Sequence, residues 1–83
     1  MDYDKLAWLK ASEYRQNILL ILSKKLGTPK DVAKETGYYL SHVSNTISDL
    51  EKKGLVKCLS PDRKKGRLYK TTKEGDGFVK LIK

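Results

Sequence analysis

The apolar residues of the chain recur at helical spacing in its first half. After Ser12, six of them fall on one helical face: Tyr14, Ile18, Leu19, Ile21, Leu22 and Leu26. Such a stripe is typical of a helix that packs against a core. Ser12 is a good N-cap and Gly27 a good stop, so we expect a core helix between them. The preceding run "YDKLAWLK" either forms a separate helical turn or continues this helix, and its Trp8 and Leu9 need cover from the domain or from a partner chain.

Two further helices are predicted on either side of a short turn. In "TPKDVAKETG", Thr28 as N-cap, Pro29 at the first helical position and Asp31 three residues after the cap start a helix, which Gly37 ends. After a four-residue turn, a second helix is predicted over residues 41–53, with the serine at its start as the cap and a glycine directly after it.

A β-hairpin and a last helix follow. The sequence "LVKCLSPDRKKGRLYKTT", residues 55–72, has two strand-like flanks around a turn that contains Pro61, Asp62 and Gly66. Thr72 can cap a final helix whose apolar residues share one face, although two glycines weaken it.

Together these elements predict a mainly α fold with a β-hairpin. The order is that of a winged helix-turn-helix, with a three-helix core, a wing and a C-terminal helix. We expect residues 1–83 to form a single domain, because a chain of this length supports one small core. The helix-turn-helix covers 28–53 and the wing covers 55–71.

The net charge of +8 is concentrated in the hairpin. Residues 55–71 hold six basic groups against one acidic group, whereas residues 28–54 hold four of each. A localised positive field of this kind attracts polyanions. A basic hairpin tip can also be an ordinary soluble turn, because lysine keeps exposed strand edges from pairing. The outward face of the helix that precedes the hairpin distinguishes between these two interpretations.

That helix presents an unusual outward face. On a helical wheel, Val43, Ile47 and Leu50 form the buried stripe. The opposite side and its shoulders carry Ser41, His42, Ser44, Asn45, Ser48, Asp49 and Lys52. An ordinary solvated face is richer in Glu and Lys, whereas short polar side chains let a helix lie close to base edges. Beside a basic hairpin, this face favours binding of double-stranded DNA.

Two stretches of the chain carry a resemblance to a known family. The run "TPKDVAKETGYYLSHVSNTISDLEKKGLV", with the spacing Ala33-x3-Gly37-x5-Val43, and the run "GRLYKTTKEG" resemble winged helix-turn-helix transcriptional regulators of the MarR and ArsR type, especially small archaeal members. The resemblance covers roughly residues 12–80. It implies a cytoplasmic regulator that binds DNA at specific sequences, with repression as the expected mode of regulation. Thr71 stands where the family usually has an apolar residue.

The resemblance also implies a role for the exposed polar groups. The residues that read bases or backbone are Ser41, His42, Ser44, Asn45 and Ser48. The wing contacts, on the backbone or in the minor groove, are Arg63, Lys64, Lys65 and Arg67. We also expect phosphate contacts from Thr28, Lys30 and Lys52, whereas Tyr38 and Tyr39 either bind phosphate or pack in the turn. Asn45 stands where the family usually has a basic residue, so the base preference does not carry over.

The two ends of the chain hold more apolar surface than a small core readily covers. The residues are Tyr3, Leu6, Trp8, Leu9, Phe78, Val79, Leu81 and Ile82. We therefore expect segments 1–11 and 72–83 to pack across a two-fold axis in a homodimer. Duplex DNA and a second copy are the expected partners, with no cofactor and no obvious small-molecule ligand. The longest apolar run has five residues, far short of a membrane span, and the single cysteine fits a reducing cytoplasm.

Other functions find less support in the residues. Metal sensing needs several ligands, and only Cys58 and His42 are candidates, so no metal site is expected. No nucleophile, phosphate-loop or paired-carboxylate motif stands out, so we expect no enzyme. Two alternatives stay open: a winged-helix protein-interaction module in a larger assembly, and RNA binding through stacking on Tyr38, Tyr39 and Tyr69. The residues do not specify the operator, the target genes, an effector, or whether regulation is repression or activation.

Overall fold

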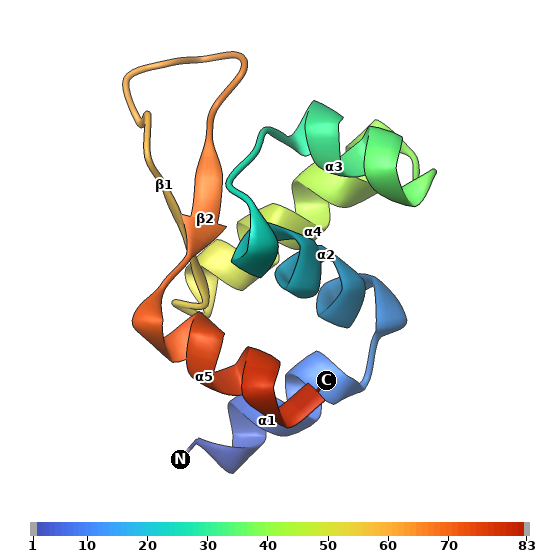
Figure 1. Ribbon diagram of the computed structural model, residues 1–83, viewed down its shortest axis with the longest axis vertical. Coiled ribbons are helices and arrows are strands. Elements are labelled where there is room, and N and C mark those ends of the chain that lie inside the picture. Colours follow the sequence, from blue (N-terminus) through green and yellow to red (C-terminus); the bar gives the residue numbers. More distant parts are fainter. Residues whose placement is uncertain (1, 83) are drawn as a thin grey trace.

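The computed structural model describes residues 2–82, which form five helices and a two-stranded antiparallel hairpin. The helices are α1 (Tyr3–Lys10), α2 (Glu13–Lys24), α3 (Pro29–Thr36), α4 (Leu40–Lys52) and α5 (Lys73–Ile82). The strands are β1 (Val56–Cys58) and β2 (Tyr69–Thr71), with Lys57 opposite Lys70. Figure 1 shows the hairpin projecting beyond α3 and α4, with α1 and α5 at the opposite end of the molecule. This architecture confirms the predicted fold class, a winged helix-turn-helix.

Side-chain caps fix where α1 and α2 begin. The Asp2 carboxylate accepts a hydrogen bond from the backbone N–H of Lys5 (3.1 Å), and the Ser12 hydroxyl accepts one from the N–H of Arg15 (3.4 Å). Each cap satisfies an N–H that the helix itself leaves free. The residues before the core helix therefore form a helix of their own, rather than an extension of it.

α3 is closed at both ends as predicted. The Thr28 hydroxyl accepts a hydrogen bond from the N–H of Asp31 (3.1 Å), and the Asp31 carboxylate accepts one from the N–H of Thr28 (3.1 Å). This reciprocal pair is a complete capping box. Gly37 ends the helix with a φ of 78°, a left-handed conformation that only glycine adopts without strain.

α4 begins one residue earlier than predicted. Tyr39 is its N-cap, in an extended conformation, and the Tyr39 carbonyl accepts the first helical bond from the N–H of Val43 (3.0 Å). No side chain caps this helix. Ser41 therefore lies inside the first turn, after Leu40, and its predicted role as the cap was wrong. The extended backbone at Tyr39 already directs the chain into the helix, so the serine is not needed there.

Gly27 does not close α2, contrary to the prediction. The helix ends at Lys24, and the N–H of Lys25 still bonds the Ile21 carbonyl (3.1 Å). Gly27 instead forms an isolated antiparallel bridge with Tyr69, with N–O distances of 3.1 Å and 2.8 Å. The bridge ties the segment between α2 and α3 to β2, so the hairpin is held against the helix-turn-helix.

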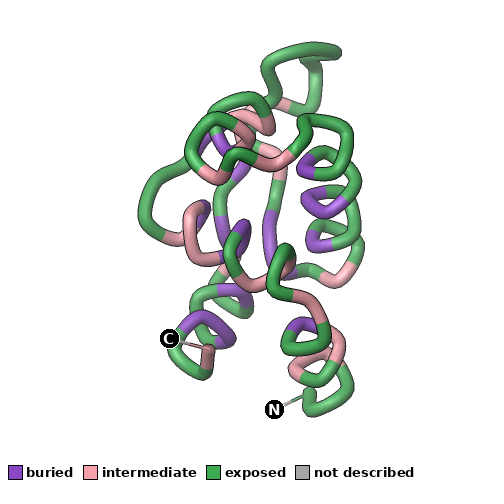
Figure 2. Tube along the Cα trace, turned by 90° about the vertical axis from the view of Figure 1, so that its right-hand side faces the viewer, coloured by how far each residue is buried: buried purple, intermediate pink, exposed green. Residues whose placement is uncertain are grey.

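The core lies on the inward faces of the five helices and of the hairpin base, as the burial colours of Figure 2 show. Its apolar residues are Leu9, Ile18, Leu19, Leu22, Val32, Val43, Ile47, Leu50, Leu55, Val56, Tyr69, Phe78 and Val79. Of the predicted α2 stripe, Ile21 is only partly buried at the edge of this core, and two residues lie outside it, because Tyr14 is 44% exposed and Leu26 is 47% exposed. Tyr14 belongs to the first turn of α2 and Leu26 follows its last turn, so the predicted stripe was too long at both ends.

α1 and α5 bury most of their apolar surface against this chain. Leu9, Phe78 and Val79 belong to the core. The Lys5 ammonium pairs with the Glu74 carboxylate at 3.0 Å, which joins the two helices. The Trp8 ring is covered by the Arg15 guanidinium at 4.2 Å and the Lys53 ammonium at 5.3 Å. Trp8 and Leu9 therefore find their predicted cover within the domain, and the large side chains that stay exposed here are Tyr3 and Leu81.

α5 passes so close to the start of the hairpin that it needs a glycine. A Cβ atom added at Gly75 would lie 2.0 Å from the Leu55 carbonyl oxygen, closer than any real contact. The Thr72 hydroxyl fixes this approach, because it accepts a hydrogen bond from the N–H of Gly75 (3.0 Å) and donates one to the Gly54 carbonyl (2.7 Å). The sequence shows Gly75 only as a poor helix former, whereas the structure shows that packing requires it.

Thr71 occupies a buried position at the end of β2 and is only 6% exposed. Its hydroxyl donates a hydrogen bond to the Asp76 carboxylate at 2.5 Å. Because the polar group is satisfied, a threonine can be buried where an apolar residue would otherwise be expected.

Candidate nucleic-acid interface

The residues predicted to read bases all lie on α4 and are all exposed: Ser41, His42, Ser44, Asn45 and Ser48. The inward side of the helix is held by Val43, Ile47 and Leu50, as predicted, and also by Thr46, which the sequence pattern missed. The Thr46 hydroxyl donates to the His42 carbonyl (2.9 Å), so it can be buried without losing a hydrogen bond. The packed inward side fixes the direction in which the polar face points.

A groove with a volume of about 650 Å³ lies between the hairpin and the helix-turn-helix. Its lining residues come from the start of α3, the start of α4 and the wing: Thr28, Pro29, Lys30, Leu40, Ser44, Lys64, Lys65, Gly66, Arg67 and Tyr69. Four of them are cationic and none is acidic. A concave surface lined by one sign of charge focuses the electric field and raises the local concentration of the opposite charge. This groove is therefore suited to a polyanion.

The wing tip is held in shape by its own hydrogen bonds. Within residues 59–68, the N–H of Leu59 bonds the Leu68 carbonyl (2.7 Å), and the N–H of Leu68 bonds the Ser60 hydroxyl (2.9 Å). The N–H of Arg63 bonds the Ser60 carbonyl (3.1 Å). These bonds narrow the loop above the short strands and hold its basic residues beside α4.

The four basic residues of the tip are not equivalent. The Arg67 guanidinium folds back on the loop and donates to the carbonyls of Arg63 and Pro61. Arg67 therefore braces the tip while it also lines the groove. Lys64 and Lys65 line the groove too, and within residues 2–82 their ammonium groups form no hydrogen bond or ion pair. Of the predicted wing contacts, the two lysines are thus the most available to a ligand.

His42 faces a different flank of α4, next to α2. Its ring packs edge-on against Tyr14, with 4.2 Å between centroids, and Tyr14 packs edge-on against Tyr38 at 4.6 Å. The Tyr38 hydroxyl also accepts a hydrogen bond from the Asn17 amide (2.8 Å). Tyr38 therefore packs against α2, as one of its two predicted roles requires, and Tyr39 is 86% exposed, while the phosphate contacts predicted for both tyrosines stay predictions. The predicted base readers are therefore spread around the helix and do not gather at the groove.

The start of α3 is less favourable to an anion than the sequence suggests. The N–H of Thr28 holds the pKa of the Asp31 carboxyl below its ordinary value, and the Thr28 hydroxyl, Lys34 and Lys25 lower it further. The ionised carboxylate offsets the positive end of the helix, and the Thr28 hydroxyl already serves as the cap. Lys30 is exposed beside the groove, so of the two residues predicted here it is the better placed for a phosphate.

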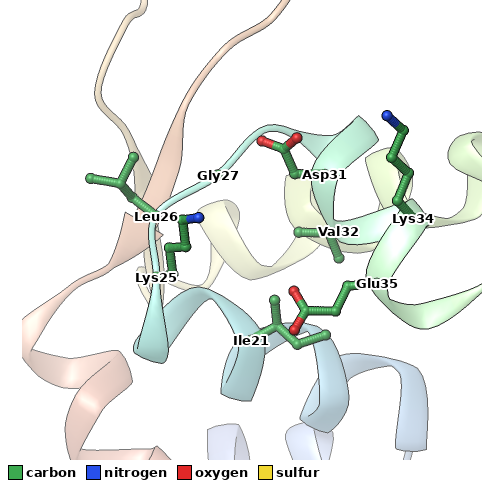
Figure 3. A pocket seen from close by; sticks show the side chains of 8 residues that line it. All are labelled: Ile21, Lys25, Leu26, Gly27, Asp31, Val32, Lys34 and Glu35. Carbon is green, nitrogen blue, oxygen red and sulfur yellow. The ribbon is translucent and has the colours of Figure 1, made fainter.

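A second hollow, with a volume of about 200 Å³, lies between the end of α2 and α3. Figure 3 shows Lys25 and Lys34 around it together with Asp31 and Glu35, and the exposed Leu26 at one edge. Because its charges are mixed, this hollow has no preference for a polyanion. It shares no lining residue with the groove beside the wing.

Neither a metal centre nor a membrane span is found in the described part of the chain. Across residues 2–82, no three His, Cys, Asp or Glu side chains are grouped so that they could hold a metal ion. Cys58 is a half-buried free thiol. In the same range, every helix is too short or too polar to cross a bilayer.

Comparison with known proteins finds similarity in structure. No protein-family model matches the chain, and no curated protein matches its sequence. MarR from E. coli, in its reduced form, superposes with a TM-score of 0.77 and 25% sequence identity, over 94% of this chain and 59% of that one. FabT from Streptococcus pneumoniae, solved in complex with DNA, superposes with a TM-score of 0.74 and 25% sequence identity, over 86% of this chain and 51% of that one. The transcriptional regulator SlyA superposes with a TM-score of 0.79 and 16% sequence identity, over 94% of this chain and 56% of that one.

The chain has the winged helix-turn-helix fold of MarR-type regulators of transcription. The similarity supports the MarR type of the predicted resemblance, whereas the ArsR type and the archaeal character stay predictions. The chain spans little more than half the length of these proteins, so properties that depend on the rest of their length are not carried over.

Four lining residues of the groove were not predicted as DNA contacts, namely Pro29, Leu40, Gly66 and Tyr69, and Leu40 is the large exposed apolar one among them. Because Ser41 looked like a helix cap, Leu40 was assigned to the turn. It is the first residue of α4, is 49% exposed and lines the groove. Extending the helical wheel back by one residue places Leu40 between Ile47 and Ser44, at the edge of the buried stripe, which is the signal that could have found it.

Proposed function

We propose that this chain binds double-stranded DNA at specific sequences and regulates transcription. α4 lies in the major groove, and the wing lies on the backbone or in the minor groove. The observation that carries the proposal is a groove with four cationic residues and no acidic one, next to a helix face of short polar side chains. The fold that it shares with FabT, which has been solved with DNA, supports the same function.

Base reading falls to the outward face of α4. Asn45 and Ser41 lie near the centre of that face, and Ser44 lies on its wing side. A major groove of about 12 Å admits one helix, and short side chains allow its backbone to approach the base edges. An asparagine amide can donate and accept at once, which matches the N6 and N7 positions of adenine. Ser48 and His42 read the flanks of the same site.

Backbone contacts come from the surroundings of α4. Lys64 and Lys65 bind phosphates on the wing side together with Arg63 and Arg67, and Lys30 adds a charge at the start of α3. The remaining predicted contacts are Thr28, Tyr38, Tyr39 and Lys52. Such contacts fix the register of a helix on DNA without specifying sequence, and they make the affinity depend on salt.

We also propose that the protein acts as a homodimer through the end of the molecule formed by α1 and α5. Tyr3 and Leu81 are exposed there, and Leu6 and Ile82 are only partly covered. A two-fold axis at this end sets two α4 helices on successive turns of a duplex. A dimer on a promoter excludes other proteins from that DNA, so repression, in a reducing cytoplasm, is the mode of regulation that we propose.

Two other functions fit the surface less well. A protein-interaction module would present an apolar or acidic face, and α4 presents a neutral polar one beside cations. RNA binding by stacking would need free aromatic rings, but Tyr69 is only 8% exposed and Tyr38 is packed against Tyr14. Tyr39 alone of the three predicted rings is open.

Selection of bound molecules from a random duplex pool tests the proposed function. We expect a short motif to be enriched, with two inverted half-sites if the protein binds as a dimer. The same protein should show no comparable enrichment from a random single-stranded RNA pool. A pool that stays random in the duplex arm would contradict sequence-specific DNA binding.

A further inference from the structure

Leu40 places an apolar side chain in the middle of a cationic surface. It is the first residue of α4, it is 49% exposed, and it lines the groove together with Lys64, Lys65 and Arg67. Of the other carbon-rich lining residues, Tyr69 is buried and Pro29 is half-buried. Leu40 is therefore the large apolar side chain that this groove leaves open to water. A bound ligand that covers it with another apolar group gains free energy in proportion to the area removed from water.

The position of Leu40 on α4 directs it to a base and not to a phosphate. The N-terminal residues of a recognition helix are those that meet base edges in the major groove. Ser44, one turn further along, lies on the same side of the helix and lines the same groove, and its small side chain leaves room beside Leu40. A phosphate gains no free energy by covering an apolar side chain, whereas the cations around Leu40 are suited to binding phosphates.

The major-groove edges of the four bases differ in what they offer an apolar side chain. Guanine, adenine and cytosine present acceptors or amino groups, and covering these with leucine would leave them without a hydrogen bond. Thymine alone presents a methyl group. We propose that Leu40 is a specificity-determining residue that packs on the C5-methyl group of a thymine in each half-site. This inference rests on the proposed function of duplex recognition.

A thymine-to-deoxyuridine scan of the selected duplex tests the contact, because uracil lacks only the methyl group and keeps the pairing. Each thymine is replaced in turn, and dissociation constants are measured for the wild type, Leu40→Ala and a control, Leu26→Ala. Leu26 is a matched control because its exposure, 47%, is close to that of Leu40, and it lies in the hollow that shares no residue with the groove. Thermal melts check that each variant is folded.

The contact predicts a pattern that no loss of stability can imitate. Removing one methyl should weaken binding of the wild type about three- to fivefold at one thymine of each half-site, the effect of exposing a single buried methyl. Leu40→Ala should bind the unmodified duplex correspondingly less tightly and should lose the sensitivity at that thymine alone. Leu26→Ala should keep the wild-type pattern. If Leu40→Ala melts early, Leu40→Asn, which has nearly the same size and branched shape but is polar, takes its place with the same expectation.

The possible failures are distinguishable. A wild type that binds its selected duplex tightly but shows no sensitive thymine overturns the contact and leaves duplex recognition standing. Equal sensitivity in the wild type and Leu40→Ala also overturns it, because the methyl would then be read by another residue. A protein that selects no duplex at all overturns the proposed function, and the contact with it.

Discussion

The two glycines of α5 have opposite reasons to be there, although the sequence presents them alike. A Cβ at Gly75 would meet the Leu55 carbonyl oxygen at 2.0 Å, whereas among residues 2–82 a Cβ at Gly77 would meet nothing within 4 Å. Helix propensity alone assigns the same cost, about 1 kcal/mol relative to alanine, to both. Only the tertiary contact separates them, which is why the sequence could not.

Alanine substitutions at these glycines should therefore change stability in opposite directions. Gly75→Ala should destabilise the protein by about 2 kcal/mol or more, because backbone has to move to admit the methyl group. Gly77→Ala should stabilise it by about 0.5–1 kcal/mol, because alanine loses less conformational entropy in a helix. Urea denaturation of both variants measures this difference. The same sign for both changes would contradict the packing described for α5.

Asn45 is the residue of α4 from which we expect the clearest base-reading effect. Asn45→Ala removes the only side-chain amide of the outward face and leaves the helix intact, because alanine is a good helix former. Binding to the selected duplex should weaken by about 1–3 kcal/mol per half-site, with binding to random duplex nearly unchanged. Equal losses on both duplexes, measured by fluorescence anisotropy, would show that Asn45 does not read bases.

Among the elements, a local signal was right at the start of α3 and misleading at the start of α4, and a contact between distant residues was not foreseen. Thr28 and Asp31 are three residues apart, so their capping box could be read directly from the sequence. The start of α4 was misplaced because the extended backbone of Tyr39 replaces the side-chain cap that Ser41 suggested. The bridge between Gly27 and Tyr69 joins residues far apart in the chain, so no local sequence pattern predicts it.

The capping box should give α3 a characteristic dependence on pH. The pKa of Asp31 is lowered in the folded protein, chiefly by the N–H of Thr28, so the unfolded state binds the proton more readily. This contribution to stability is present above the unfolded pKa of about 3.9 and is lost as the pH falls through the lower folded value. Asp31→Asn should therefore lower the melting temperature at pH 7 and have a progressively smaller effect toward pH 2.

The exposed carboxylate of Glu35 on the same helix provides the control. Glu35→Gln removes one negative charge without touching the cap, and thermal melts between pH 2 and pH 7 compare the two variants with the wild type. A difference between wild type and Asp31→Asn that stays constant over this range would contradict the role of the ionised carboxylate in the cap.

At the scale of the whole molecule, the two ends have different characters. The wing end holds the cationic groove, whereas the end formed by α1 and α5 holds Tyr3 and Leu81, which are 75% and 44% exposed. The distribution of charge along the chain could be predicted from the sequence, because each ionic side chain contributes its charge to its segment however the chain folds. The exposure of apolar side chains could not be predicted in this way. In the sequence Leu9 and Phe78 resemble Tyr3 and Leu81, but they are buried within the chain.

The proposed dimer predicts a concentration-dependent mass. Sedimentation equilibrium at micromolar protein should show a dimer for the wild type and a shift toward monomer for the double variant Tyr3→Ser, Leu81→Ser, because exposed apolar surface is then lost from the interface. The double variant should keep its fold, since both residues lie at the surface. A wild type that stays monomeric throughout would contradict the dimer.

The salt dependence of DNA binding, measured with a wing variant, tests the central claim most directly. The variant replaces Arg63, Lys64, Lys65 and Arg67 with serine, and a control replaces Lys10, Lys24, Lys73 and Lys80, which are exposed and do not line the groove. Both variants lose four positive charges, so the comparison separates the position of the lost charge from its amount. Each phosphate that a cation neutralises adds nearly one unit to the slope of log K against log salt.

We expect the wing variant to bind every duplex less tightly and to flatten this slope by roughly two to four units per wing, while the control changes it much less. Thermal melts should show both variants folded, because exposed substitutions usually cost under about 0.5 kcal/mol each. A wing variant whose slope equals that of the wild type, or only that of the control, would contradict a wing that binds the DNA backbone beside α4.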